Sequence, residues 1–252
     1  MSELEKTIKI NEDLTLVQRV NGLTFGTDAY LLAAMTKGGS RLTCADLGSG
    51  TGIIPLLCAA KGKFKKIYAV EIQKEFAALI ERNADINGLS DVILSVCSDV
   101  RALNATALGG EVDVVTANPP YMKLYSGKRN LHDEKFIARH EVCGGIEDFC
   151  ACAYRILKNG GKLYTVWRPD RLCDLIDSLR KNKLEPKKII FVHATPVSQP
   201  SMVLVQSTKC ASSGSVVSRP LFLHDSPDDA QKSLLSGDAE RIYESCSFDS
   251  FD

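Results

Sequence analysis

Apolar residues in this chain occur in short runs that alternate with longer amphipathic stretches. The short runs are rich in Val, Ile and Leu, which predicts buried strands at Leu42–Leu47, Ile67–Val70, Val92–Val96, Val112–Ala117 and Leu163–Trp167. The longer stretches predict helices at Ile53–Ala60, Lys74–Asn87, Ile146–Leu157 and Pro169–Lys181. Repeated strand–helix units of this kind favour a parallel sheet that is covered by helices on both faces.

The chain departs from this alternation at both ends of the predicted sheet. After the last helix come two strands, Ile189–His193 and Met202–Gln206, and their short connection favours an antiparallel pair. Before the first strand, Asn21-Gly22 separates two strand-like runs within Leu16–Phe25, which is typical of a β-hairpin. The predicted fold class is therefore α/β: a Rossmann-like, mostly parallel sheet with an antiparallel last strand, helices on both faces and an N-terminal β-hairpin.

The composition of the chain suggests three regions. Residues 1–40 are expected to form the hairpin and a short helix capped by Thr27 or Asp28, both packing on the main domain of residues 41–210. Residues 211–252 are first Ser-rich and then acidic, with few large apolar residues. This composition predicts a loosely held C-terminal extension.

The overall composition and charge limit the function classes that apply. Of the 252 residues, 44% are hydrophobic and 25% are charged, which is typical of a globular protein. We expect a cytoplasmic protein, because no run is long enough to span a membrane and the N-terminus has no signal layout. Lys plus Arg and Asp plus Glu both number 31, but residues 225–252 hold eight acids and two bases. The rest of the chain is therefore moderately basic, which is compatible with a polyanionic partner.

The nine cysteines of the chain favour reduced thiols over a disulfide framework or a metal site. There is no Cys-x-x-Cys pair, and the count is odd in a chain without a signal. Cys44, Cys58 and Cys97 lie in apolar patterns and are expected to be small core residues. Since the usual spacing of zinc ligands is missing, no metal is predicted.

The segment Asp46–Gly52 leads from a predicted strand into a predicted helix. Its alternating Gly48, Gly50 and Gly52 let the backbone turn sharply and let a ligand lie against it, next to the unpaired N–H groups of the helix. This spacing differs from the Gly-x-Gly-x-x-Gly of dinucleotide enzymes, and an acid precedes the glycines. A carboxylate favours the cationic S-adenosylmethionine over a pyrophosphate. A tight turn without a ligand is the alternative interpretation.

Two more acids follow the next predicted strands. Glu71 ends the second strand and is placed to accept hydrogen bonds from both ribose hydroxyls of a nucleoside. Asp99 follows the third strand and is placed to accept from an adenine amino group, while Val100 or Ile72 packs on the ring. Each acid alone would be a solvated turn residue. Acids at the carboxyl ends of successive strands, however, meet at the edge where such sheets bind ligands.

A tetrapeptide, Asn118-Pro-Pro-Tyr121, follows the fourth predicted strand directly. Pro119 and Pro120 fix the backbone so that the Asn118 side-chain carbonyl and a main-chain carbonyl point the same way. Two such acceptors hold an exocyclic NH₂ group and aim its lone pair at a methyl group. Tyr121 offers a face on which a planar base stacks, which is worth ~1–3 kcal/mol per base. The alternative is a proline-rich strand end.

The segments Asp46–Gly52 and Asn118–Tyr121 resemble those of class I methyltransferases that act on amino nitrogens. The amino nitrogens in question belong to adenine in nucleic acid, guanine in ribosomal RNA or glutamine in release factors. Five further segments are similar to the tRNA-valine adenine-N6 methyltransferase family. They are Phe25–Ala33, Ser126–Asn130, Ala138–Glu141, Trp167–Leu172 and Leu184–Lys188. The resemblance covers roughly residues 10–210, and Trp167 stands where His is expected.

The resemblance implies an enzyme that binds S-adenosylmethionine, releases S-adenosylhomocysteine and methylates N6 of the adenine next to the anticodon of a tRNA. The implied cofactor-binding residues are Asp46, Gly48, Ser49, Gly50, Thr51, Gly52, Glu71, Ile72, Asp99, Val100 and Asn118. The implied catalytic residues are Asn118, Pro119, Pro120 and Tyr121. A glutamine in a release factor or a guanine N2 in ribosomal RNA is the alternative substrate. No membrane, metal or obligate protein partner is expected.

Basic residues near the tetrapeptide are candidate RNA contacts. The polar stretch Lys123–Glu141 fits no element and is expected to be a functional or disordered loop. This loop and the helix start after the fifth strand supply the candidate phosphate contacts Lys123, Lys128, Arg129, Arg139, His140, Arg168 and Arg171. His140 is expected to position the substrate. A general base is not required, because an amine that has attacked a sulfonium loses its proton readily to water.

Overall fold

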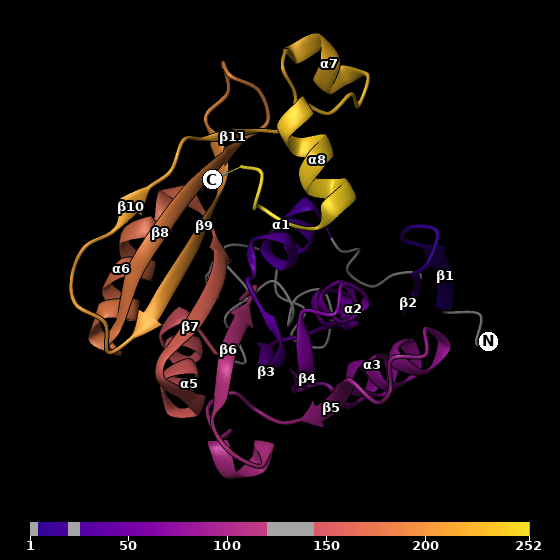
Figure 1. Ribbon diagram of the computed structural model, residues 1–252, viewed down its shortest axis with the longest axis vertical. Coiled ribbons are helices and arrows are strands. Elements are labelled where there is room, and N and C mark those ends of the chain that lie inside the picture. Colours follow the sequence, from indigo (N-terminus) through magenta and orange to yellow (C-terminus); the bar gives the residue numbers. More distant parts are fainter. Residues whose placement is uncertain (1–4, 20–25, 120–143, 252) are drawn as a thin grey trace, which may run out of the picture.

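The computed structural model describes residues 5–19, 26–119 and 144–251. Its described strands form a mixed sheet in the order β10-β8-β9-β7-β6-β3-β4-β5, with β11 beside β8 (Figure 1). These strands are β3 (Gly39–Leu47), β4 (Phe64–Glu71), β5 (Ile93–Cys97), β6 (Val112–Ala117), β7 (Leu157–Trp167), β8 (Leu184–His193), β9 (Pro200–Lys209), β10 (Val216–Val217) and β11 (Leu221–Phe222). Only β9 runs antiparallel to its neighbours, β7 and β8. The predicted α/β class with a mostly parallel sheet is confirmed.

Helices cover both faces of this sheet. On one face lie α1 (Thr27–Met35), α2 (Ile53–Ala60) and α3 (Lys74–Ile86), and on the other α5 (Ile146–Ile156) and α6 (Leu172–Lys181). Two short 3₁₀ turns are η1 (Ala105–Leu108) and η3 (Pro169–Arg171). In α3, Phe76, Leu79 and Ile80 are buried while Lys74 is exposed. This three-and-four spacing gives the helix one apolar side that faces the rest of the protein.

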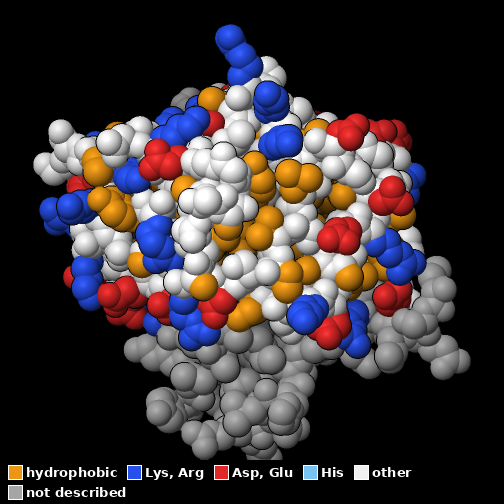
Figure 2. Space-filling view, turned by 90° about the horizontal axis from the view of Figure 1, so that it is seen from below, with side chains coloured by type: hydrophobic (Ala, Val, Ile, Leu, Met, Phe, Trp, Pro, Cys, Tyr) orange, Lys and Arg blue, Asp and Glu red, His pale blue; other side chains and the backbone are white. Residues whose placement is uncertain are grey.

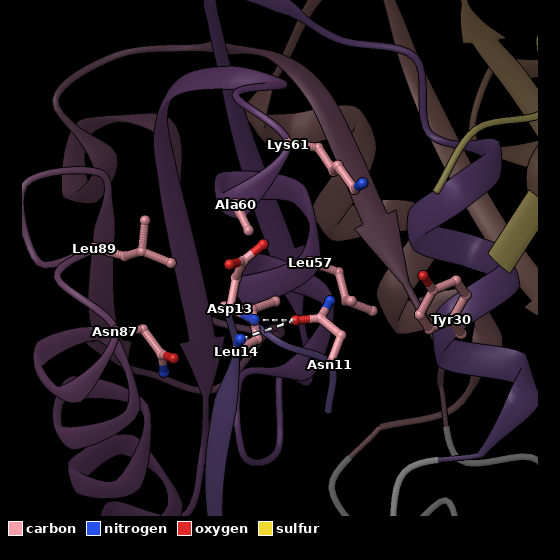
Figure 3. Close-up of a pocket in the computed structure, with 9 residues that line it drawn as sticks. All are labelled: Asn11, Asp13, Leu14, Tyr30, Leu57, Ala60, Lys61, Asn87 and Leu89. Atoms are coloured by element: carbon pink, nitrogen blue, oxygen red, sulfur yellow. Dashed lines mark hydrogen bonds between the residues drawn. The ribbon is translucent and has the colours of Figure 1, made fainter. Parts of the chain in front are cut away.

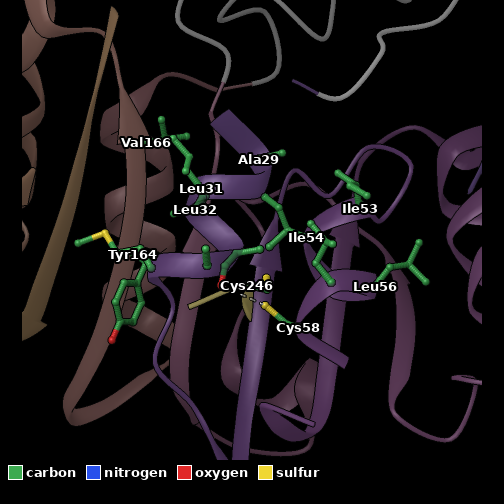
Figure 4. Packing of buried hydrophobic residues seen from close by; sticks show 14 of the residues in the cluster. Ala29, Leu31, Leu32, Ile53, Ile54, Leu56, Cys58, Tyr164, Val166 and Cys246 are labelled. Atoms are coloured by element: carbon green, nitrogen blue, oxygen red, sulfur yellow. Dashed lines mark hydrogen bonds between the residues drawn. The ribbon is translucent and has the colours of Figure 1, made fainter. Parts of the chain in front are cut away.

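Each face of the sheet has its own hydrophobic core. On the face of α1 and α2, Leu32 and Ile54 belong to one buried cluster with Tyr164 of β7 (Figure 4). On the opposite face, Ile156 of α5 and Leu175 of α6 belong to a second cluster. Burying side chains of this size contributes about 1.5–3 kcal/mol each. The two cores therefore hold the helices in fixed positions relative to the strand ends.

An N-terminal two-stranded hairpin precedes the sheet, and its turn lies between Lys9 and Thr15. The strands are β1 (Glu5–Lys9) and β2 (Thr15–Arg19), and they pair antiparallel. In the turn, Asn11 Oδ1 accepts hydrogen bonds from the backbone N–H groups of Asp13 at 3.0 Å and Leu14 at 2.9 Å. Asn and Asp favour turns through such local side-chain bonds. The Asn21-Gly22 turn lies outside the described residues.

The C-terminal extension belongs to the folded core, so the expectation of a loosely held tail is wrong. Both β10 and β11 pair with β8, and α7 (Pro227–Gln231) and α8 (Gly237–Ser245) follow them. Ile242, Phe248 and Phe251 are at most 4% exposed and belong to the cluster of α1 and α2. A few well-spaced apolar residues dock this segment, and its average composition does not reveal them.

Two local expectations also need correction. Cys44 and Cys58 are buried as predicted, but Cys97 is exposed because it ends β5, an edge strand of the sheet. Helix α1 is capped by Gly26 without a side-chain hydrogen bond, so neither Thr27 nor Asp28 is the cap. Along the described parts of the chain, no helix is long and apolar enough to cross a membrane.

Candidate cofactor and substrate site

The carboxyl ends of β3, β4 and β6 meet at one edge of the sheet. The register pairs Leu47 of β3 with Val70 of β4 on one side and with Ala117 of β6 on the other. The next residues of the three strands therefore lie side by side: Gly48 stands between Glu71 and Asn118. At this position the sheet order changes direction, with β6 on one side of β3 and β4 on the other. Open α/β sheets bind ligands at such a switch point.

The glycine loop between β3 and α2 is held by backbone hydrogen bonds. The N–H groups of Gly48 and Ser49 both donate to the Val70 carbonyl at 2.9 Å. Gly48, Gly50 and Gly52 have φ values of 71°, 56° and 85°, a region that side chains other than glycine rarely adopt. A Cβ placed on Gly50 would meet no heavy atom within 4 Å, so a ligand has room to approach the backbone there.

Asp46 is buried beneath this loop. The residue is 1% exposed. Its Oδ1 accepts from the Thr116 hydroxyl at 2.6 Å and its Oδ2 accepts from the Ser49 hydroxyl at 2.7 Å. Burial raises its pKa from 3.8 to about 7, although the two hydroxyls oppose the shift. Asp46 therefore joins β3, β6 and the loop, and it offers almost no surface for direct contact with a ligand in this conformation.

Glu71 fastens the same loop from the neighbouring strand. It is 6% exposed, and its Oε2 accepts from the Gly50 N–H at 2.9 Å while its Oε1 accepts from the Gln73 N–H at 3.0 Å. Burial raises the pKa of the Glu71 carboxyl above its ordinary value. A carboxylate placed directly at the glycine loop fits the hydroxyl groups of a nucleoside that lies on the loop.

Asp99 follows β5 and is engaged by a neighbour. Its two oxygens accept from Arg101 Nε at 3.0 Å each, and the Arg101 backbone N–H also donates to it at 2.8 Å. Hydrogen bonding from Arg101 lowers the pKa of Asp99. Val100 is buried and Ile72 is half-buried, so both offer apolar surface at this side of the edge.

Asn118 lies on the other side of the glycine loop. Its side-chain Nδ2 donates to Asp28 Oδ2 of α1 at 2.9 Å, a contact that the sequence did not suggest. The amide oxygen Oδ1 therefore points away from the carboxylate. Pro119 is buried, and the remaining catalytic candidates, Pro120 and Tyr121, lie outside the described residues. The described part of the site thus places the open glycine loop beside an Asn118 amide whose orientation is set by Asp28.

A family model of the methyltransferase small domain matches residues 20–179, which include the glycine loop and Asn118. The chain belongs to this family. It is therefore a methyltransferase, and its methyl donor is S-adenosylmethionine. The open backbone at Gly50 and the carboxylate of Glu71 beside it fit this cofactor.

Curated relatives and a solved structure show the same likeness. The methyltransferase is 28% identical over 187 residues to the tRNA1(Val) (adenine(37)-N6)-methyltransferase of Porphyromonas gingivalis, which covers 71% of this chain and 72% of the relative. It is 26% identical to the protein of that name from Bacteroides fragilis, over 73% of this chain and 76% of the relative. A predicted O-methyltransferase from Agrobacterium tumefaciens superposes with a TM-score of 0.62 at 22% identity, over 83% of this chain and 98% of that one. The last comparison shows the fold alone.

Two of the predicted RNA contacts of this methyltransferase lie among the described residues. Arg168 follows β7, and its half-exposed side chain contacts Asp170 through Nε at 2.9 Å and Nη2 at 2.8 Å. The Arg171 side chain is only 14% exposed and lies 5.1 Å from the centre of the Trp167 ring. Trp167 is buried, and its Nε1 donates to the Arg171 carbonyl at 2.9 Å. Arg171 and Trp167 therefore stabilise this turn, and Arg168 is the more accessible cation.

The other predicted RNA contacts lie outside the described residues: Lys123, Lys128, Arg129, Arg139 and His140. On the face shown in Figure 2, the described basic side chains are interspersed with acidic ones around exposed apolar groups. The formal net charge of the chain is zero. The total charge of the chain therefore does not by itself favour a polyanionic partner.

Two residues that support the loop were missed by the sequence analysis. Asn83 of α3 is fully buried, and its Nδ2 donates to the carbonyls of Val17 at 3.0 Å and Thr51 at 2.9 Å. It thereby joins the hairpin to the glycine loop. Phe149 of α5 lies so close to Gly48 that an added Cβ would be 3.3 Å from its ring. Asn83 could have been found from the sequence, because a polar residue on the apolar side of a predicted helix needs a buried hydrogen-bond partner.

A pocket lies away from this site (Figure 3). It is lined by Asn11, Asp13, Leu14, Tyr30, Leu57, Ala60, Lys61, Asn87 and Leu89. Helices α2 and α3 begin at the cofactor edge and run to the opposite edge of the sheet, and the pocket lies at their far ends beside the hairpin turn. It is therefore separate from the glycine loop and Asn118.

Proposed function

We propose that this methyltransferase transfers the methyl group of S-adenosylmethionine to the N6 amine of adenine 37 in a valine tRNA. The observation that carries the proposal is the oriented amide of Asn118 beside the glycine loop. The names of the relatives from Porphyromonas gingivalis and Bacteroides fragilis support the same substrate. A tRNA substrate also implies a cytoplasmic location.

In this proposal the cofactor lies on the glycine loop at Gly48–Gly52. Gly50 leaves room for it and Glu71 accepts hydrogen bonds from its ribose hydroxyls. Ile72 and Val100 pack on the adenine ring, and Asp99 accepts from the adenine amino group once Arg101 yields one of its bonds. Asp46 acts indirectly, through its bonds to Ser49 and Thr116, by keeping the loop in shape.

The residues of the chain act on the substrate mainly by positioning it. The target base leaves its stack, as substrates of base-modifying enzymes do. Asn118 Oδ1 and the backbone carbonyl beside Pro119 accept the two N–H groups of the amine, which aims its lone pair toward the cofactor. Pro120 fixes this backbone, and Tyr121 offers a stacking surface. The bound cofactor supplies an electrophilic methyl group on its sulfonium.

Contacts with the tRNA backbone are proposed for the candidate cations. Arg168 stands at the same edge of the sheet as Asn118, because β6 and β7 are parallel neighbours. Phosphate contacts of this kind set the register of the RNA on the protein without reading its sequence. The remaining groups proposed for this role are Lys123, Lys128, Arg129, Arg139 and His140, whereas the mostly buried Arg171 stabilises the turn.

The deciding experiment is methylation of defined substrates by the purified enzyme with a labelled methyl donor. The substrates are unmodified valine tRNA transcript, the same transcript with adenine 37 replaced by guanine, a release factor and ribosomal RNA. We expect label only in the first transcript, recovered as N6-methyladenosine after digestion. Label in the release factor or the ribosomal RNA, with none in tRNA, would refute the assignment.

A further inference from the structure

The bond between Asn118 and Asp28 joins the end of β6 to the first turn of α1, which lies 90 positions earlier in the chain. We infer that Asp28 is a positioning residue that orients and polarises the Asn118 amide for methyl transfer. The inference rests on the proposed function, in which Asn118 Oδ1 accepts from the target amine. Asp28 itself needs no contact with the substrate.

The orientation follows from the hydrogen-bonding roles of the two groups. An ionised carboxylate only accepts hydrogen bonds, whereas an amide has an accepting oxygen and a donating nitrogen of nearly the same size. Asp28 therefore contacts Nδ2, as the 2.9 Å bond shows, and Oδ1 takes the opposite side of the amide. Without this partner both orientations are accessible. A flipped Asn118 would present N–H groups to an amine that also donates.

The same bond polarises the amide in the direction that catalysis needs. A hydrogen bond to a charged acceptor is stronger than a neutral one, and bonds in a chain strengthen each other. Donation from Nδ2 to Asp28 moves electron density toward Oδ1. This oxygen then stabilises the positive charge that develops on the attacking nitrogen more than it stabilises the neutral amine, so the effect falls mainly on the rate.

The backbone around Asp28 leaves space for its carboxylate. An added Cβ on Gly26 would lie 2.7 Å from Asp28 Oδ1, closer than such atoms pack. Gly26 has φ −111° and ψ −178°, an extended conformation that any residue adopts. A glycine at position 26 is therefore needed because a side chain there would collide with Asp28 Oδ1, and the backbone conformation does not require it. One oxygen of Asp28 occupies that space while the other reaches Asn118.

A role for Asp28 in helix stability alone does not account for this geometry. An acid in the first turn of a helix interacts favourably with the helix dipole. Glu75 has that position in α3 and is exposed. The dipole effect needs only the charge, whereas Asp28 in addition contacts Asn118 across the fold. Glu75 thus provides a matched control for the loss of a first-turn charge.

The C-terminal helix α8 supports the turn that carries Asp28. Tyr243 of α8 stacks on Tyr30 of α1 with ring centres 4.5 Å apart, and the Tyr30 hydroxyl donates to the Tyr243 carbonyl. Burial raises the pKa of Tyr243, a hydrogen bond with the Thr27 side chain lowers it, and the charge of Asp28 raises it. The extension therefore packs against the residues on both sides of Asp28.

The test uses Asp28→Asn, Gly26→Ala and Glu75→Gln in the full-length protein. Single-turnover methylation of valine tRNA should slow about 10- to 100-fold in Asp28→Asn, which corresponds to losing one hydrogen bond to a charged group. Gly26→Ala should slow it in the same direction by displacing the carboxylate. Glu75→Gln should match the parent protein. In all three, S-adenosylhomocysteine affinity by calorimetry and the thermal melting temperature should stay near the parent values.

A double-mutant cycle with Asn118→Ala separates this inference from the proposed function. If Asp28 acts through Asn118, adding Asp28→Asn to Asn118→Ala should cause no further loss of rate. An Asn118→Ala that is strongly slowed but still measurable, together with a fully active, folded Asp28→Asn, would overturn the role of Asp28 and leave the proposed function intact. Equal losses from Asp28→Asn in both backgrounds would also overturn it. A fully active Asn118→Ala would instead overturn the proposed function.

Discussion

The hydroxyl of Thr116 on β6 donates a 2.6 Å hydrogen bond to Asp46 Oδ1 at the end of β3. This bond crosses the strand pair beneath the glycine loop, and the Ser49 hydroxyl donates to the other oxygen. Burial nevertheless dominates, and it raises the pKa of Asp46 to about 7. A carboxyl with a raised pKa in the folded protein stabilises the fold most when it is protonated.

The first prediction concerns stability and pH. The folded pKa of Asp46, about 7, exceeds the ordinary value of 3.8, so its stabilising contribution is complete below 3.8 and is lost as pH rises through 7. The free energy of unfolding should fall between these limits by at most about 1.4 kcal/mol per pH unit from this group. In Asp46→Asn this component should vanish, as measured by urea unfolding from pH 4 to 8.5.

Thr116→Val is the matched variant for this prediction. It removes a donor that lowers the pKa of Asp46, so the decline of stability should begin at the same pH but extend to higher pH. Glu71 is present in all three proteins, and its raised pKa contributes with the same sign. The contribution of Asp46 to the pH dependence is therefore obtained by subtracting the unfolding free energies of Asp46→Asn from those of the parent protein at each pH. Identical pH profiles for the parent and Asp46→Asn would contradict the assignment.

The second prediction concerns Glu71 and the cofactor. Glu71→Gln keeps the length of the side chain but removes its charge and one of the acceptors that hold Gly50 and Gln73. Affinity for S-adenosylhomocysteine should weaken by about 1–3 kcal/mol, the cost of leaving polar groups unpaired. Calorimetry measures it, with Glu75→Gln as the control. Unchanged affinity would remove Glu71 from the cofactor site.

Much of the sheet follows from the sequence because its signals are local. The strand that ends at Leu47 and the helix that starts at Ile53 are marked by apolar runs and by the alternating glycines between them. The hairpin of β1 and β2 has a less prominent signal, since Asn11 closes its turn through local side-chain bonds, whereas the Asn21-Gly22 turn lies outside the described residues. The docked tail was missed because Phe248 and Phe251 find their partners only through long-range contacts.

In the candidate site, too, residues with a local sequence signal were predicted and residues that act through long-range contacts were missed. Glu71 and Asn118 were predicted at strand ends and lie there, on both sides of Gly48. Asp28 was read as a helix cap, because Asp near a helix start is favoured there. Its contact with Asn118 joins residues 90 positions apart. Such a pair has no signature in a single sequence, since each residue already has an adequate local explanation.

The third prediction separates the two described arginines. Arg168→Ala should weaken tRNA binding and reduce the salt dependence of affinity by about one unit of slope, since one phosphate contact is lost. Arg171→Ala should mainly lower the melting temperature, because Arg171 lies over Trp167 and is 14% exposed in its side chain. Arg180→Ala, 62% exposed at the far end of α6, is the control. Equal salt slopes for Arg168→Ala and Arg180→Ala would exclude Arg168 from the RNA interface.

The fourth prediction tests whether the C-terminal extension contributes to stability. Phe248 is 1% exposed and contacts Phe251 edge-on, with ring centres 5.4 Å apart. Phe248→Ala should cost about 3–5 kcal/mol of unfolding free energy, as expected for a large buried aromatic residue. Leu234→Ala, in the same extension but 53% exposed, should change it by less than about 0.5 kcal/mol. A tail that is detached in solution would make both variants equally stable in urea unfolding.

The last prediction exchanges the chemistry of Asn118 and Asp28. In Asn118→Asp, a second carboxylate takes the place of the amide that now donates to Asp28 at 2.9 Å. Two carboxylates at this separation do not both ionise readily, so they share a proton. Methylation should be slow at pH 8 and should recover in part at pH 6, where the proton is retained.

Adding Asp28→Asn to Asn118→Asp restores one donor and one acceptor with their positions exchanged. The amide at position 28 donates to one oxygen at position 118, and the other oxygen accepts from the target amine. At pH 8 the double variant should exceed Asn118→Asp by about tenfold, which corresponds to roughly 1.4 kcal/mol of transition-state stabilisation. Single-turnover rates at both pH values measure this, and thermal melts confirm that each protein is folded. A double variant no faster than Asn118→Asp would show that the two side chains do not act as a pair during methyl transfer.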